Sequence, residues 1–289
     1  MLFDLLLQPF LDYGFMRRAL VGAAALALAG SPLGVFLILR RMSLAGDALS
    51  HAILPGAALG YLIAGLSLPA MTLGGLAAGL VVAMLAGAVA RFTALREDAS
   101  LAAFYLLSLA LGVTLVSLKG SSVDLLHVLF GSALALDDAA LLLLAGVATV
   151  TLFALALFYR ALVMDTLDPI FLRQTTRLGG LAPFLFLTLV VLNLVAGFHA
   201  LGTLMAVGLI MLPAASARLW TRDLAAALPL AAALGAGAAY TGLVFSYHSG
   251  TPAGPAIVLA AGLAYSASLV FGPAGGLTRL RRPSRHLEG

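Results

Sequence analysis

The sequence predicts an all-α integral membrane protein, a polytopic helical bundle with about eight or nine transmembrane helices. Hydrophobic residues make up 62% of the 289-residue chain, charged residues make up only 10%, and the mean hydropathy is +1.10. A soluble domain carries about 25% charged residues, so no water-soluble fold could bury this much apolar surface. The apolar stretches are long and continuous rather than alternating with a period of two residues, which argues against a transmembrane β-barrel.

Nine apolar stretches are long enough to cross a membrane, since a transmembrane helix needs about 20 mostly apolar residues. Several are separated only by short turns, so an arrangement of eight spans, with one stretch that does not cross, remains open. No internal repeat or low-complexity linker divides the chain, and residues 1–289 are expected to form one transmembrane domain. The expected spans are roughly 19–39, 48–66, 69–90, 99–118, 138–159, 181–197, 201–217, 224–247 and 254–272.

The basic residues predict the orientation of the bundle. With nine spans, one side holds thirteen arginines and the other holds only Arg17, Arg18 and Lys119. Because basic residues concentrate in cytoplasmic loops, the arginine-rich side should be cytoplasmic, with the C-terminus inside and the N-terminus outside. The basic residues are scattered singly and in pairs, which argues against nucleic acid as a partner. The thirteen are Arg40, Arg41, Arg91, Arg96, Arg160, Arg173, Arg177, Arg218, Arg222, Arg279, Arg281, Arg282 and Arg285.

One acidic residue stands apart from the others. Asp47 falls at the start of a span or inside it, whereas every other Asp and Glu falls in a loop, a tail or the end of a span. His51 follows one helical turn later, about 40° around the helix axis, so the two side chains share a face. A carboxylate and an imidazole together suit Mn(II), Fe(II) or Zn(II). The alternative is structural: Asp47 caps the helix, and His51 packs on a backbone carbonyl.

Three further histidines, His127, His199 and His248, are expected on or near the external side, where they could pass a cation inward. The chain has no cysteine, which excludes thiolate ligands and cysteine nucleophiles. It also has no zinc-protease, serine-hydrolase or phosphate-binding-loop motif, so it is not expected to be an enzyme or to bind ATP. Any ATP-driven role therefore needs a second subunit.

A single long polar interruption, residues 159–180, falls on the predicted cytoplasmic side. Asp168 and Pro169 form a helix-start signal, and a short amphipathic stretch with Arg173 and Arg177 follows. The segment is either a simple connector or a docking helix for a cytoplasmic partner.

The stretch RRMSLAGDALSHAILPGAALG, at 40–60, resembles the signature of the membrane subunits of ABC importers for zinc, manganese and iron. Four further blocks appear in that family's order: VDLLHVLFGSALAL, DTLDPIFLRQTTRLGG, ALGTLMAVGLIMLPAASARLW and TPAGPAIVLAAG. The likeness covers nearly the whole chain.

The resemblance implies a homodimeric permease of the cobalamin-importer-like type in the bacterial inner membrane. Two cytoplasmic ATPases would drive it and an extracytoplasmic metal-binding protein would supply it, with no stably bound cofactor. The resemblance also implies that Asp47 and His51 contribute to the metal pathway and that 165–180 is the coupling helix, including Asp168, Pro169, Arg173 and Arg177. His199 departs from the family pattern, which often has Gln or Lys there.

Three alternatives remain. A permease for a metal chelate or cobalamin shares the architecture but has no need of a bare Asp–His pair. A secondary, proton-coupled cation carrier normally needs more intramembrane ionisable residues and no docking helix. An intramembrane enzyme would need a catalytic constellation that the sequence lacks.

Single introduced cysteines test the predicted orientation, because the chain has none of its own. Loops near Arg96, Thr175 and Arg222 should be cytoplasmic, and segments 119–133 and 248–255 should be external. An impermeant thiol reagent added to intact cells should therefore label Ser249→Cys and spare Thr175→Cys. Labelling of Thr175→Cys from outside would overturn the orientation.

Overall fold

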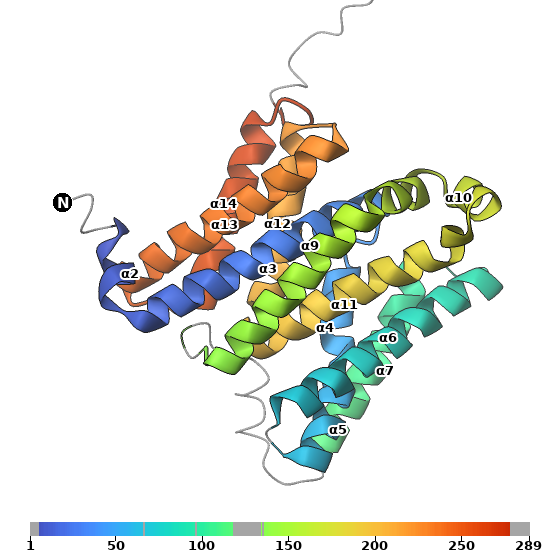
Figure 1. Cartoon of the computed structure of the whole chain (residues 1–289), viewed down its shortest axis with the longest axis horizontal. Helices are drawn as coiled ribbons and strands as arrows, with labels where there is room; N and C mark the ends of the chain where they lie inside the picture. The colour runs from blue at the N-terminus through green and yellow to red at the C-terminus, as the bar shows by residue number, and fades with distance from the viewer. Residues whose placement is uncertain (1–5, 66, 96, 118–133, 135, 278–289) are drawn as a thin grey trace, which may run out of the picture.

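The computed structural model describes residues 6–65, 67–95, 97–117, 134 and 136–277. Every regular element in these ranges is a helix, which confirms the all-α prediction, and the helices pack as one bundle (Figure 1). They are α2 (Gln8–Asp12), α3 (Gly14–Leu39), α4 (Ala45–Ala52), α5 (Leu54–Ala64), α6 (Leu68–Phe92), α7 (Glu97–Ser117), α9 (Asp138–Leu167), α10 (Pro169–Thr175), the 3-10 turn η2 (Arg177–Gly180), α11 (Leu181–Leu201), α12 (Thr203–Trp220), α13 (Leu224–Ser249) and α14 (Ala253–Phe271).

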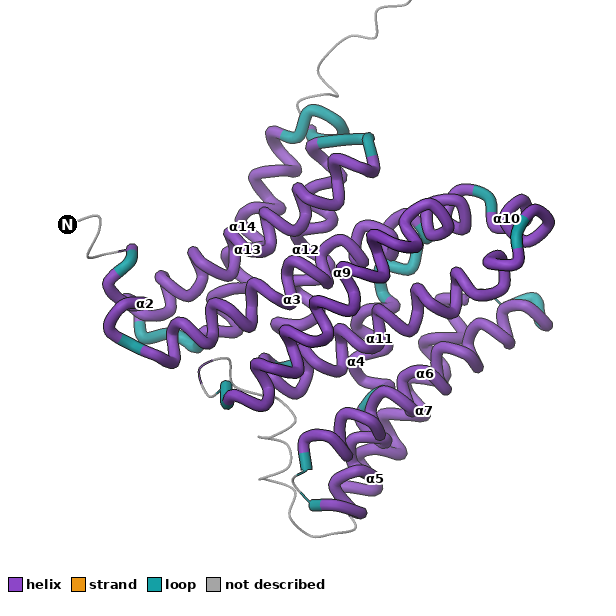
Figure 2. Tube along the Cα trace, in the orientation of Figure 1, coloured by secondary structure: helices purple, strands orange, loops and turns teal. Residues whose placement is uncertain are grey.

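Within the described ranges, eight segments are long and apolar enough to cross a membrane, and α4 with α5 forms one of them. Helix α7 contains a shorter apolar stretch, Ala99–Leu115. Loops and turns gather at the helix ends (Figure 2). The expected eight or nine spans are therefore met by eight segments and one shorter apolar helix.

Successive spans of the chain run in opposite directions, whereas α3 and α9 run parallel, since Arg18 pairs with Asp138 at their starts and Arg40 with Asp165 at their ends. Tyr13, just before α3, contacts Tyr247 near the end of α13, with ring centroids 5.7 Å apart. At the other end, Leu39 packs in one apolar cluster with Ala217 of α12. The indole of Trp220 there donates a hydrogen bond to a serine near the end of α14. One end thus carries residues 40–44, 168–180 and 221–223, which hold five of the arginines expected on the cytoplasmic side.

Two expected spans differ from the observed helices. The span expected at 48–66 is broken into α4 and α5, because Pro55 lies in the first turn of α5 and has no N–H to continue the helix. The span expected at 138–159 continues to Leu167 as a single helix of 30 residues, α9. Asp165, expected in a polar connector, is therefore buried inside the last turns of α9, with 6% of its surface exposed.

The core surrounds α3, which contacts α9, α11, α12 and α13. Small residues allow close approach: a Cβ on Gly34 would lie within contact distance of the Ile210 carbonyl, so α3 and α12 touch through their backbones. Pro213 in α12 has no N–H for the carbonyl of Leu209, one turn earlier. The hydroxyl of Ser31 in α3 donates a hydrogen bond to that carbonyl at 2.7 Å. The backbone carbonyl that α12 leaves without a partner is thus hydrogen-bonded by a neighbouring helix, as the membrane interior requires.

Helices α5 and α6 form a hairpin that depends on glycine. A Cβ on Gly56 would overlap the carbonyl of Gly74, and a Cβ on Gly74 would overlap the carbonyl of Gly56. Ser108 of α7 donates a hydrogen bond at 2.9 Å to the carbonyl of Ala52, at the end of α4. These contacts hold the break between α4 and α5 in place.

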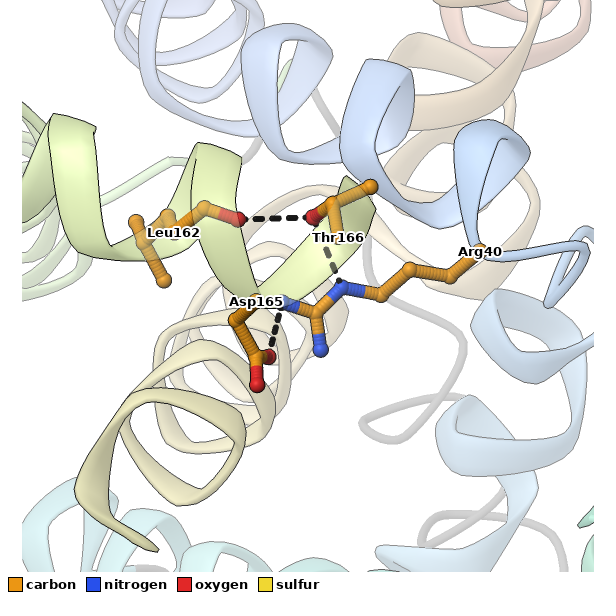
Figure 3. A network of polar contacts seen from close by, with 4 residues as sticks. All are labelled: Arg40, Leu162, Asp165 and Thr166. Atoms are coloured by element: carbon orange, nitrogen blue, oxygen red, sulfur yellow. Dashed lines mark hydrogen bonds and ion pairs between the residues drawn. The ribbon is translucent and has the colours of Figure 1, made fainter. Parts of the chain in front are cut away.

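A buried ion pair joins α3 to α9 (Figure 3). The Nη2 atom of Arg40 lies 2.7 Å from Oδ2 of Asp165, and the two side chains are only 13% and 3% exposed. The Nε atom of Arg40 donates to Oγ1 of Thr166 at 3.3 Å. The guanidinium also lies 4.1 Å from the centroid of the Phe186 ring in α11, a cation–π contact. One arginine therefore ties three helices together.

Removal of one partner should destabilise the bundle. Asp165→Ala leaves the guanidinium of Arg40 buried without its carboxylate, which should lower the free energy of unfolding by about 3–5 kcal/mol. Arg18→Ala is the matched control, because Arg18 pairs with Asp138 across the same two helices at 3.0 Å but with side chains 48% and 76% exposed. That control should change the free energy by no more than about 1 kcal/mol. Thermal unfolding of the detergent-purified protein measures both, and equal shifts would contradict the prediction.

Candidate functional site

The predicted pair of Asp47 and His51 lies on α4, a helix of eight residues. Nε2 of His51 is 3.8 Å from Oδ1 of Asp47, within ion-pair range but longer than a hydrogen bond. The opposite face of α4 is buried, including Ala48 and Leu49. The sequence prediction that both side chains share one face is therefore confirmed.

The local fold does not use Asp47 as a helix cap. The N-cap position of α4 is Leu44, and no side-chain capping hydrogen bond is present there. Asp47 lies in the first turn of the helix, and the one described partner of its carboxylate is His51. The alternative in which Asp47 is retained for capping is therefore disfavoured by the geometry.

The two side chains do not point into the interior of this single chain. Asp47 is 64% exposed and His51 is 31% exposed. The reason is packing: α4 lies against α6, α7, α11 and α12, and these neighbours cover its other side. An ionised carboxylate is strongly unfavourable against lipid. This face of α4 therefore requires a polar environment that the described part of one chain does not supply.

Few other groups approach the pair. The ring of Tyr105 in α7 lies 6.2 Å from the ring of His51, centroid to centroid. Among the described residues, no group of three or more His, Cys, Asp or Glu side chains is placed to hold a metal ion. One chain thus offers two ligands at this position, one carboxylate and one imidazole.

Of the other predicted histidines, His199 and His248 do not join Asp47. His199 lies in the last turn of α11, and its Nδ1 is 2.9 Å from the carbonyl of Val195. Because a carbonyl only accepts hydrogen bonds, Nδ1 carries the proton and Nε2 presents a lone pair, which is buried and has no hydrogen-bond partner in the described structure. His248 is exposed at the end of α13. His127 lies outside the described residues.

The connector 165–180 contains a short helix, α10, at one extremity of the bundle (Figure 1). Asp168 caps it, because its Oδ1 accepts a hydrogen bond from the N–H of Phe171 at 2.9 Å, and Pro169 occupies the first turn. The predicted helix start is therefore confirmed. The backbones of Arg173 and Arg177 are described, in α10 and η2, but their side chains lie outside the described structure.

Two features near α10 were missed in the sequence. Leu167, Ile170 and Phe171 form an apolar patch around the helix, with exposures of 73%, 67% and 46%. Their spacing at i, i+3 and i+4, typical of one face of a helix, was the available signal. The second feature is the Arg40–Asp165 pair, for which no local signal exists because its partners are far apart in sequence.

Comparison with known proteins gives one consistent result. Residues 12–272 match the model of the ABC 3 transport family. The chain is 32% identical over 267 residues to the manganese import system permease protein ScaB of Streptococcus gordonii, covering 92% of this chain and 95% of ScaB. It is 33% identical over 283 residues to the manganese transport system membrane protein MntC of Halalkalibacterium halodurans, covering 97% and 96% of the two chains.

A solved structure has the same fold. PsaBC from Streptococcus pneumoniae, in complex with Fab, contains a chain that superposes with a TM-score of 0.84 at 29% sequence identity. The match covers 98% of this chain and 100% of that chain. The described helices thus have the same arrangement as those of a chain in PsaBC.

Proposed function

The chain belongs to the ABC 3 transport family, as a permease of the metal ABC importer type, and from this premise we propose that it carries a divalent transition metal ion into the cytoplasm. The proposed cargo is manganese, since relatives covering nearly the whole chain are named for manganese import. Zinc and iron stay as alternatives, because a carboxylate and an imidazole bind all three ions.

The observation that carries the proposal is the exposed Asp47–His51 pair inside a membrane-spanning segment. The carboxylate attracts the cation, and the neutral imidazole supplies a nitrogen ligand of borderline softness. Two ligands replace part of the hydration shell without enclosing the ion. Conduction needs this moderate affinity, because an ion that binds too tightly cannot leave.

The proposed transporter contains two copies of this chain. The face of α4 that bears Asp47 lacks a polar environment in one copy, and a second copy related by two-fold symmetry would present the same face. Two copies would then offer four ligands, two carboxylates and two imidazoles, along one aqueous path. Lipid would cover the remaining apolar surface.

The other proposed partners follow from the two ends of the bundle. The end with α10 and the arginine-rich loops faces the cytoplasm, where a pair of ABC ATPases docks on α10 of each copy. The opposite end receives metal from an extracytoplasmic binding protein. The C-terminus is then cytoplasmic, in the inner membrane of a bacterium. In this arrangement the chain itself hydrolyses no ATP.

Asp47→Asn tests the metal site. The substitution keeps the size of the side chain and removes its charge, so manganese uptake should fall at least about ten-fold, since loss of a charged contact is typically worth about 1.5–3 kcal/mol. His51→Ala should lower uptake similarly. Uptake by cells that lack the native gene measures the effect for Mn, Zn and Fe separately, with expression and ATPase association checked in parallel. Normal uptake by Asp47→Asn would show that the charge has no transport role.

Charge reversal in the connector tests ATPase docking. Arg173→Glu and Arg177→Glu should each reduce the ATPase that co-purifies, because they change the charge of the docking surface while α10 keeps its Asp168 cap. Arg222→Glu is the matched control: it makes the same change in the exposed α12–α13 turn at the same end of the bundle. An intact complex in both connector variants, with ATP hydrolysis still coupled to transport, would refute the docking role.

A further inference from the structure

The Arg40–Asp165 ion pair lies between the two functional segments of the chain. Arg40 is the residue at which α3 ends, and Asp165 lies in the last turns of α9. Asp47 follows Arg40 by seven positions, and Asp168, which caps α10, follows Asp165 by three positions. Each partner of the ion pair is therefore attached to one of the two segments.

The connection from Arg40 to α4 is short and hydrogen-bonded. The N–H of Met42 donates to the carbonyl of Leu37 at 2.9 Å, and the N–H of Arg41 donates to the carbonyl of Ile38 at 3.0 Å. Arg41 has a positive φ of 59°, so the turn is a Schellman motif with arginine where glycine is usual. The N–H of Ala45 then donates to the carbonyl of Met42 at 3.0 Å, at the start of α4. A displacement of Arg40 is thus passed on to α4.

The connection from Asp165 to α10 is equally direct. The N–H of Asp168 donates to the carbonyl of Met164 at 2.8 Å, so α9 ends without a flexible linker. The carboxylate of Asp168 then accepts from the first turn of α10. Thr166, between them, accepts from Arg40 and donates to the carbonyl of Leu162 at 2.7 Å. Figure 3 shows the guanidinium of Arg40 in contact with Asp165 and Thr166, and Thr166 in contact with the carbonyl of Leu162.

We propose that the Arg40–Asp165 ion pair is a coupling element that transmits movement of α10 to α4 and so sets the position of Asp47 during transport. The inference rests on the proposed function, in which an ATPase acts on α10. Arg40 and Asp165 are positioning residues here, since neither is placed to touch the metal.

The chemistry of the pair suits this role better than a purely structural one. Well-packed apolar residues often stabilise a buried site as well as an ion pair does, so stability alone does not require the charges. An ion pair differs because it fixes the relative orientation of the two side chains. The planar guanidinium contacts Asp165, Thr166 and Phe186 at once. Movement of α9 therefore carries the guanidinium with it, whereas apolar side chains could slide.

A paired substitution tests the coupling without leaving a buried charge. The double variant Arg40→Met/Asp165→Leu removes both partners. The matched control, Arg18→Met/Asp138→Leu, removes an Arg–Asp pair between the same two helices in the exposed region at the other end of the bundle. Both are reconstituted in liposomes with the ATPase and the extracytoplasmic binding protein, and manganese uptake per ATP hydrolysed is measured.

The Arg40/Asp165 variant should hydrolyse ATP but transport roughly ten-fold less manganese per ATP, within the 5–150-fold range of ordinary coupling energies. The control should keep the ratio of the unmodified transporter. An unchanged ratio in the assembled Arg40/Asp165 variant overturns the inference while the proposed function stands. No manganese uptake by the unmodified transporter instead overturns the proposed function.

Arg40→Lys tests the inference if the double variant does not assemble with the ATPase. Lysine keeps the positive charge but, as a single ammonium, cannot contact Asp165 and Thr166 and stack on Phe186 together. Its ratio of manganese to ATP should fall while the assembled complex is retained. A ratio equal to that of the unmodified transporter overturns the inference.

Discussion

The fold depends on one constraint: inside a membrane, every backbone polar group must find a partner within the protein. Regular helices meet it by themselves, but the prolines in this chain leave carbonyls that their own helix cannot satisfy. Ser31 of α3 donates to the carbonyl freed by Pro213 in α12, and Ser108 of α7 donates to the end of α4 near Pro55. Helix breaks and helix packing are therefore linked in α12 and at the end of α4, because a serine from a neighbouring helix satisfies a backbone carbonyl at each place. The glycines that allow such close approach, Gly34 and Gly56, belong to the same arrangement.

Charges within the bundle are accommodated in two contrasting ways. Arg40 and Asp165 are buried against each other at 2.7 Å, with the guanidinium also stacked on Phe186. Asp47 and His51 are 3.8 Å apart and accessible. The first geometry holds helices together, since neither group has room for another ligand between them. The second geometry leaves the carboxylate and the imidazole accessible to a cation, as a transient cation site requires.

The functional segments are distributed over a scaffold rather than concentrated in one cavity. α10 lies at one extremity of the bundle, and α4 lies deeper, packed on α6, α7, α11 and α12. The Schellman turn at Arg41 joins α4 directly to α3. Helix α3 in turn contacts α9, α11, α12 and α13 in the core. A protein built this way can pass force from one face to an interior site through helices that move as rigid units.

Sequence alone was sufficient for much that depends on local chemistry: the all-α class from hydropathy, most of the spans from length, the shared face of Asp47 and His51 from helical period, and the start of α10 from Asp168-Pro169. Three-dimensional packing was needed for what depends on distant residues. Arg40 and Asp165 are separated by more than a hundred positions, so nothing in the sequence paired them, and Asp165 was expected in a polar connector. Nor could periodicity tell which side of α4 its neighbours would cover, and therefore that Asp47 would stay exposed in a single chain. Local patterns predict which side chains share one face of a helix. The burial and pairing of those side chains depend on which other helices the tertiary fold packs against that face.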